Sequence, residues 1–157
     1  MSALIGDRLP PGFLATFDGS SLATKVGLGY LLLTADADGS PRPCMLSPGE
    51  ILATDERHVR LALWAGSHTS ANLAREASNL LCYVAKGSVL YVRGRPRALG
   101  RIEHLGVDCF EVEVSSVESD DHPGMPVVDT IRFELTGPTL ADVAAEWQER
   151  IAALRAL

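Results

Sequence analysis

The sequence lacks the short motifs that most often identify an enzyme class. It contains no GxxxxGK[ST] phosphate-binding loop and no GxSxG nucleophile turn. Gly27-Leu28-Gly29 precedes a strand-like run instead of a helix, which argues against a dinucleotide-binding fingerprint. The four histidines form neither an HExxH motif nor a close pair, so no metal site is expected.

Cysteine and positive charge are also scarce. Cys44, Cys82 and Cys109 show no CxxC spacing and lie in apolar runs, so we expect buried free thiols in a reducing cytoplasm. The net charge of −6 argues against a general nucleic-acid binder. The N-terminus lacks a signal-peptide layout, and no apolar run approaches the roughly 18 residues of a membrane span. These absences predict a soluble cytoplasmic protein without nucleic-acid or membrane partners.

Hydrophobic residues, in contrast, are abundant. They make up 46% of the 157 residues, and the mean hydropathy is +0.12. A chain of this length favours a single domain over residues 1–157, and the apolar share exceeds what one monomer needs for its core. We therefore expect an apolar surface that serves as an interface.

Alternating apolar positions and short turns predict many strands and few helices. A helix is expected within 9–19, a second within 69–77, and an amphipathic helix capped by Thr139 over 139–157. Strands are expected within 29–46 and 49–64, each range a hairpin, and within 79–85, 88–99, 108–119 and 127–135. Because no βαβ alternation occurs, this order predicts a mainly β fold, an antiparallel barrel with flanking helices.

The segment 63–73, LWAGSHTSANL, changes abruptly from an apolar strand to a cluster of hydroxyl groups at a helix start. The first turn of a helix leaves N–H groups unpaired, Gly66 allows close approach of a ligand, and Ser67, Thr69 and Ser70 add donors. The segment therefore suits a phosphate group. A simpler alternative, favoured by the local sequence alone, is that Ser67 only caps the helix.

The order of the neighbouring segments bears on this choice. DADGSPRPCMLS, a hairpin ending in LALWAGSHTSANL, then LLCYVA and YVRGRPRAL together resemble the pyridoxamine 5′-phosphate oxidase-like flavin-binding split barrels. The match covers most of residues 26–100. The resemblance implies a split β-barrel that forms a homodimer with FMN at the subunit interface.

The resemblance also implies which residues contact the cofactor. The strand that lines the flavin ring corresponds to 42–47, the strand beneath the ribityl chain to 61–64, and the phosphate turn to 67–69, with Asn72-Leu73 beginning the helix. The implied cofactor-binding residues are Arg42, Cys44, Met45, Leu46, Ser47, Leu61, Leu63, Trp64, Ser67, His68, Thr69 and Asn72. Cys44 is expected to be a buried thiol rather than a redox group.

Two departures from the family pattern stand out. His68-Thr69 replaces a usual Arg-Lys pair, and losing charge-assisted bonds of about 1.5–3 kcal/mol each would weaken FMN binding by about one or two orders of magnitude. Arg42, or the alternating Arg93, Arg95 and Arg97, could supply charge, although those three could equally form a solvated face or pair with acids. The C-terminal helix with Trp147 has no counterpart of the substrate-gripping segment, so vitamin B6 oxidation is not expected.

The sequence therefore predicts an FMN-dependent oxidoreductase that acts on a small-molecule substrate, which the sequence does not identify, with a flavin that carries the electrons. Two alternatives stay open. One is a non-catalytic carrier of flavin, deazaflavin or haem in the same fold, and the other is a dimer without a cofactor.

Overall fold

The computed structural model describes all 157 residues and is mainly β. The strands are β1 (Ala3–Gly6), β2 (Leu28–Ala35), β3 (Pro41–Leu46), β4 (Ile51–Asp55), β5 (His58–Trp64), β6 (Asn79–Ala85), β7 (Ser88–Ile102), β8 (Val107–Ser119) and β9 (Ile131–Arg132). The helices are α1 (Pro11–Thr16), α2 (Leu22–Lys25), α3 (His68–Ala74) and α4 (Leu140–Ala156), with a 3-10 turn over Glu103–Leu105. The predicted class, an antiparallel barrel with flanking helices, is confirmed.

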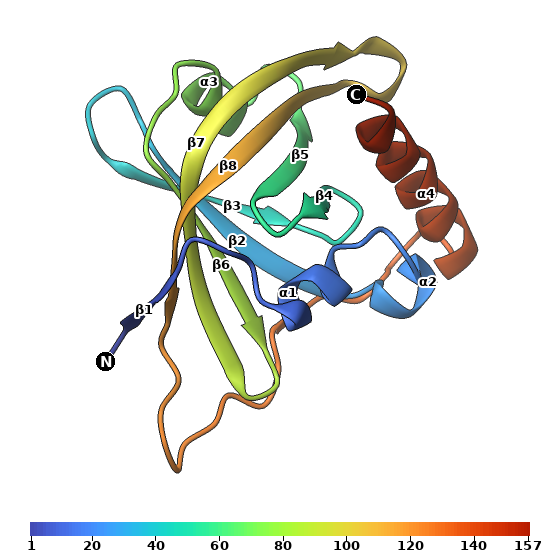
Figure 1. The fold of residues 1–157 in the computed structure, drawn as a ribbon. Coiled ribbons are helices and arrows are strands. Elements are labelled where there is room, and N and C mark those ends of the chain that lie inside the picture. The colour runs from blue at the N-terminus through green and yellow to red at the C-terminus, as the bar shows by residue number, and fades with distance from the viewer.

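The strands form one antiparallel sheet in the order β3-β2-β6-β7-β8-β5-β4, with β1 on β8 and β9 on β2. The two longest strands, β7 and β8, curve through both halves of the barrel (Figure 1). Register shifts at Arg93/Gly94 and Ala98/Gly100 allow this bend, since bulges increase local twist. A Cβ at Gly94 would lie 2.4 Å from Val112 Cγ1, so the bulge needs glycine.

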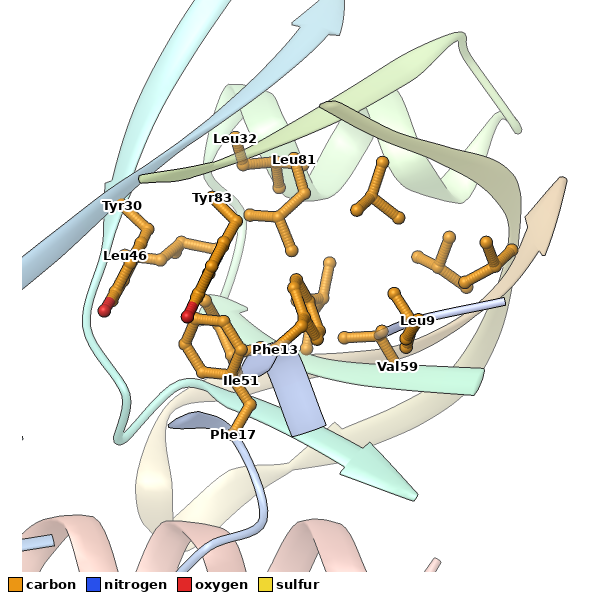
Figure 2. Packing of buried hydrophobic residues seen from close by; sticks show 14 of the residues in the cluster. Leu9, Phe13, Phe17, Tyr30, Leu32, Leu46, Ile51, Val59, Leu81 and Tyr83 are labelled. Atoms are coloured by element: carbon orange, nitrogen blue, oxygen red, sulfur yellow. The ribbon is translucent and has the colours of Figure 1, made fainter. Parts of the chain in front are cut away.

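The main core fills the barrel and is closed at one end by α1 (Figures 1 and 2). Phe13 and Phe17 from the α1 region meet Tyr30 and Tyr83 from β2 and β6, with Phe17 and Tyr30 ring centroids 4.9 Å apart. The rings of Tyr30 and Tyr83 are parallel, with centroids 5.8 Å apart. Burial raises the pKa of Tyr30 to about 12. Four of the nine aromatic residues of this chain thus form one cluster in the barrel core.

A second, smaller core holds α4 against the outside of the barrel (Figure 1). Trp147, Ile151 and Leu154 of α4 pack with Leu52 of β4 and Ala62 of β5. The predicted Thr139 cap is confirmed, because its hydroxyl accepts from Asp142 N–H while Asp142 accepts from Thr139 N–H in a capping box.

The predicted strand at 127–135 is wrong for most of its length, because only Ile131–Arg132 pairs, with Leu28 and Gly29 of β2. From Tyr30 onward β2 pairs with β3 along one edge, and from Leu31 with β6 along the other, so no free edge remains for a longer partner. The sequence also did not predict β1 or α2.

The expected cysteine chemistry is confirmed only in part. All three thiols are free, but only Cys109 is fully buried, while Cys44 and Cys82 are half-buried. Burial raises the pKa of Cys109 to about 11, which makes it a poor nucleophile at neutral pH. No helix has the length and apolarity that crossing a membrane requires.

Candidate functional site

Strand β3 lies at one end of the sheet and pairs only with β2, so its outer edge is open. In the β2–β3 hairpin, Asp36 N–H donates to the Ser40 carbonyl, which sets the register of the two strands. In this register the backbone groups of Arg42, Cys44 and Leu46 point toward β2. The outward backbone groups therefore belong to residues 41, 43 and 45. Since two of these are prolines, Met45 supplies the one N–H of this edge.

The side chains of β3 alternate between the core and the surface. Leu46 is fully buried, and Cys44 packs at the rim of the main core. Met45 points outward and is 53% exposed. Of the two residues predicted to cover a flavin ring, Met45 is therefore available to a ligand, whereas Leu46 supports the strand from inside.

Arg42 and Asn72 are brought together, although not as free ligand-binding groups. Arg42 Nε donates to both carboxylate oxygens of Asp36 at 2.8 and 2.9 Å, and Asn72 Nδ2 donates to Asp36 at 2.8 Å and to Thr34 at 2.9 Å. These bonds, the one from Arg42 first, lower the pKa of Asp36 to about 2. The network ties the β2–β3 turn to α3, and Arg75 extends it by donating to Asn72 Oδ1 at 2.8 Å.

The turn after β5 has the helix-capping geometry that the local sequence favours. Ser67 is the N-cap of α3, and its Oγ accepts from the N–H of Ser70 at 3.1 Å. Gly66 has a φ of 73°, and a Cβ there would meet nothing within 4 Å, so the turn is open to solvent. The N–H groups of His68 and Thr69 donate to no group of the chain. Capping by Ser67 therefore leaves two donors free.

An acidic residue that the sequence did not indicate lies at the same turn. Asp108 of β8 accepts from Gly66 N–H at 3.1 Å and from the hydroxyl of Ser70 at 2.5 Å. Arg101 of β7 pairs with it at 2.7 Å, and this bond is the main reason that the pKa of Asp108 falls to about 2. The Asp108 carboxylate thus already occupies two of the hydrogen-bond donors of the turn, Gly66 N–H and the Ser70 hydroxyl.

The remaining predicted residues divide into core and surface. Leu61 and Leu63 are buried in the main core, whereas Trp64, at the end of the same strand, is 68% exposed. Thr69 is buried and lies against the thiol of Cys44, and His68 is exposed near Asp36. The main-chain N–H and hydroxyl of Ser47 both donate to Glu50, at 2.7 and 2.8 Å.

A cavity of about 370 Å³ joins part of the predicted site to α4. Its lining includes Met45, Leu46, Ser47 and Trp64 together with residues of the 133–135 segment and of α4. Trp147 and Arg150 of α4 belong to this cavity, although the sequence indicated a packing or interface role for Trp147 and none for Arg150. No local motif marks these two residues, because their position depends on how α4 docks.

None of the three arginines of β7 acts at the turn, and two of them pair within the chain. Arg93 forms an ion pair with Glu118, and Arg97 with Glu111 at 2.7 Å, both on the neighbouring strand β8. Arg95 has no ion-pair partner and lies with His58 in a polar surface depression. None of the three lines the cavity beside Trp64.

The site fits the ring of a flavin better than its phosphate. The open edge at Met45 offers one donor between carbonyl acceptors, which suits the alternating edge of a pyrimidine-type ring, and Met45 and Trp64 offer apolar cover. The turn offers the free N–H groups of His68 and Thr69, but Asp108 brings negative charge beside them.

Comparison with known proteins identifies the fold. No protein-family profile matches the sequence. The chain is 29% identical over 140 residues to the uncharacterised protein YclD of Bacillus subtilis, covering 88% of this chain and 90% of YclD.

Solved structures identify the fold, at lower identity. A provisionally assigned pyridoxamine 5′-phosphate oxidase from Lactobacillus delbrueckii has a TM-score of 0.58 at 17% identity, over 74% of this chain and 98% of that one. An F420 reductase has a TM-score of 0.52 at 12% identity and covers 69% of this chain and 98% of its own. An FMN-binding protein from Syntrophomonas wolfei has a TM-score of 0.50 at 13% identity and covers 73% of this chain and 85% of its own. The chain therefore has the split-barrel fold of the pyridoxamine 5′-phosphate oxidase-like proteins, as its sequence predicts.

Proposed function

We propose that this protein is a homodimeric FMN-binding split-barrel protein that acts as a small flavin-dependent oxidoreductase. The observation that carries the proposal is the convergence of the open β3 edge, the exposed Met45 and Trp64, and a turn with two free N–H groups on one side of the barrel. Solved neighbours with the same fold include an FMN-binding protein and an F420 reductase, which supports a flavin-type ligand.

Each part of this surface has a definite role in the proposal. The N–H of Met45 and the carbonyls beside it bind the polar edge of the ring, and Met45 and Trp64 exclude water from its face. The N–H groups of His68 and Thr69, with the hydroxyl of Ser67, hold the phosphate. When bound, the flavin supplies hydride or single-electron transfer, so the chain itself needs only to bind, orient and shield it.

A second copy of the chain completes the site in this proposal. Trp64 is 68% exposed and Met45 53% exposed in the single chain, which is unusual for large apolar side chains and typical of an interface. Burying them between two copies would dry the same surface that binds the ring.

The visible spectrum of the purified protein tests the proposal directly. A yellow protein with flavin absorbance bands that releases FMN on denaturation is the expected result. A colourless protein that also fails to bind added FMN in a titration would contradict it.

Substitutions at the turn test the placement of the phosphate. Ser67→Ala combined with Thr69→Ala should weaken FMN binding more than riboflavin binding, because only FMN carries the phosphate. Loss of the Ser67 cap costs about 1 kcal/mol of stability, but it affects both ligands equally. Ser78→Ala, at an exposed serine outside the site, is the matched control. Equal losses for the two ligands would place the phosphate elsewhere.

A carrier without turnover is the second candidate, and the position of Asp108 favours it. A carboxylate beside the turn weakens the hold on a phosphate, which suits a flavin that is held loosely and released. If FMN binds but neither NADH nor NADPH reduces it, the carrier is favoured over the oxidoreductase. Reduction of the bound flavin by either nucleotide would favour the enzyme.

A further inference from the structure

The cavity between β3, Trp64 and α4 contains a cation whose hydrogen bonds are incomplete. Arg150 is 7% exposed, and its Nε is buried without any hydrogen-bond partner. The guanidinium makes one hydrogen bond, from Nη2 to Glu146 one helical turn earlier. Burying a charge with unmet hydrogen bonds is costly, and an anionic ligand in the cavity would supply the missing acceptors.

The counterion of Arg150 is easily displaced. The side chain of Glu146 is 57% exposed, so its carboxylate regains hydration by turning outward when another anion takes its place. The second acid of the cavity, Glu50, already accepts from the N–H and hydroxyl of Ser47, which balances part of its charge. An incoming carboxylate therefore has one cation to bind and one mobile competitor.

The other walls of the cavity are apolar and aromatic. Trp64, Trp147, Phe133 and Met45 are among the residues that line its volume of about 370 Å³. This volume is at the lower end of the range for small-molecule sites, and aromatic walls suit a flat ring.

We propose that this cavity binds a small aromatic carboxylate, whose carboxyl group pairs with Arg150 and whose ring packs against the aromatic lining. Because Met45 belongs to both surfaces, the ligand would contact a flavin bound at β3, and in that respect its role as substrate rests on the proposed function. Binding itself does not depend on the flavin.

The chain offers a direct readout, because its only two tryptophans, Trp64 and Trp147, line the cavity. Benzoate, added to the purified full-length protein, should quench the tryptophan fluorescence saturably, whereas neutral benzamide should bind at least tenfold more weakly. Glu146→Gln should tighten benzoate binding several-fold, since Arg150 loses its competing partner. Isothermal titration calorimetry with the same ligands and variants gives an independent measurement of the dissociation constants.

Substitutions of Arg150 distinguish benzoate binding in this cavity from nonspecific binding. Arg150→Lys keeps the charge but loses the planar donor set and should weaken benzoate about tenfold, with Arg150→Gln weakening it further. Arg95→Gln removes one unpaired surface cation outside the cavity and should leave binding unchanged. Circular dichroism confirms that each variant is folded.

Three outcomes would overturn the proposal. Equal binding of benzoate and benzamide, or tighter binding of the cation benzylamine, would show that Arg150 does not select an anion. Fluorescence that does not change with benzoate, either at high protein concentration or after dilution, would show that the cavity binds no aromatic carboxylate. A negative benzoate result beside a positive FMN titration would reject this site and leave the flavin proposal intact.

Discussion

Asp108 has the largest influence on how an anion meets the turn after β5. It takes Gly66 N–H and the Ser70 hydroxyl, and Arg101 is committed to it. A phosphate that binds at His68 and Thr69 therefore approaches a negative charge instead of the positive charges that family members commonly provide. One distant strand residue changes the electrostatics of a segment that is otherwise well suited to an anion.

Replacing this carboxylate should improve phosphate binding. Asp108→Asn is expected to strengthen FMN binding about tenfold, equivalent to ~1.4 kcal/mol, because it removes a negative charge and releases Arg101. Riboflavin binding should change little, since it lacks the phosphate. Parallel titrations of the two ligands measure the difference, and an equal change in both would rule out a role for Asp108 at the phosphate.

The two strongly acidic carboxyl groups also predict a pH dependence. The pKa values of Asp36 and Asp108 are about 2 in the folded protein, below the ordinary value of 3.8. Because the folded values are lowered, their contribution to stability is complete above about pH 4 and is lost as the pH falls toward 2. Urea midpoints measured over this range should fall steeply, and the fall should be shallower in Asp108→Asn. A wild-type midpoint that does not vary with pH would contradict the assignment.

At the scale of elements, the docking of α4 depends on a glycine in the loop before β4. A Cβ on Gly49 would lie 2.2 Å from Cγ of Trp147, so either the loop or the indole would have to shift. Gly49 therefore allows the indole to lie flat on the loop, and this contact holds the α4 wall of the cavity in place. Arg60 adds a polar contact by donating to the Leu154 carbonyl at 2.8 Å at the other end of the helix.

Enlarging this glycine should loosen the helix. Gly49→Ala is expected to cost about 1–3 kcal/mol of unfolding free energy through overpacking and to shift the tryptophan emission. Gly12→Ala is the matched control, because a Cβ there meets only Tyr83 Oη at 3.8 Å. Urea denaturation followed by fluorescence measures both. If the two variants were equally stable, the Trp147 contact would not hold α4.

Elements with a strong periodic pattern could be predicted from the sequence, and those that depend on distant partners could not. The hairpins at 29–46 and 49–64 and the helix at 139–157 follow from local alternation, turn residues and a cap. At 127–135 the same alternation gave a wrong prediction of a long strand. Only Leu28 and Gly29 of β2 were left to pair with this segment. The short β1 forms only through pairing with β8, which local patterns do not reveal.

At the scale of the whole molecule, the open edge of β3 and its exposed apolar neighbours form one surface. Pro41 and Pro43 prevent this edge from pairing with another strand, so a partner copy would cover side chains rather than extend the sheet. The chain is thus suited to side-by-side association around a ligand.

This surface predicts the oligomeric state. We expect a homodimer in sedimentation velocity, and Trp64→Glu should shift it toward monomer because a carboxylate would be buried at the interface. Leu4→Glu, at another exposed apolar residue that lies on the peripheral strand β1, is the control and should leave the dimer intact. A wild-type monomer at high concentration would remove the interface from the proposed function.

The sequence by itself determined the fold class, most element boundaries and the order of segments that resembles a flavin-binding split barrel. These features depend on alternation, turns and caps, which act over a few residues. The tertiary structure decided which predicted residues are accessible: Leu61, Leu63 and Leu46 are in the core, while Met45 and Trp64 face outward. It also brought Asp108 to the turn and Arg150 to the cavity, because such contacts depend on strand pairing and helix docking between segments far apart in the chain.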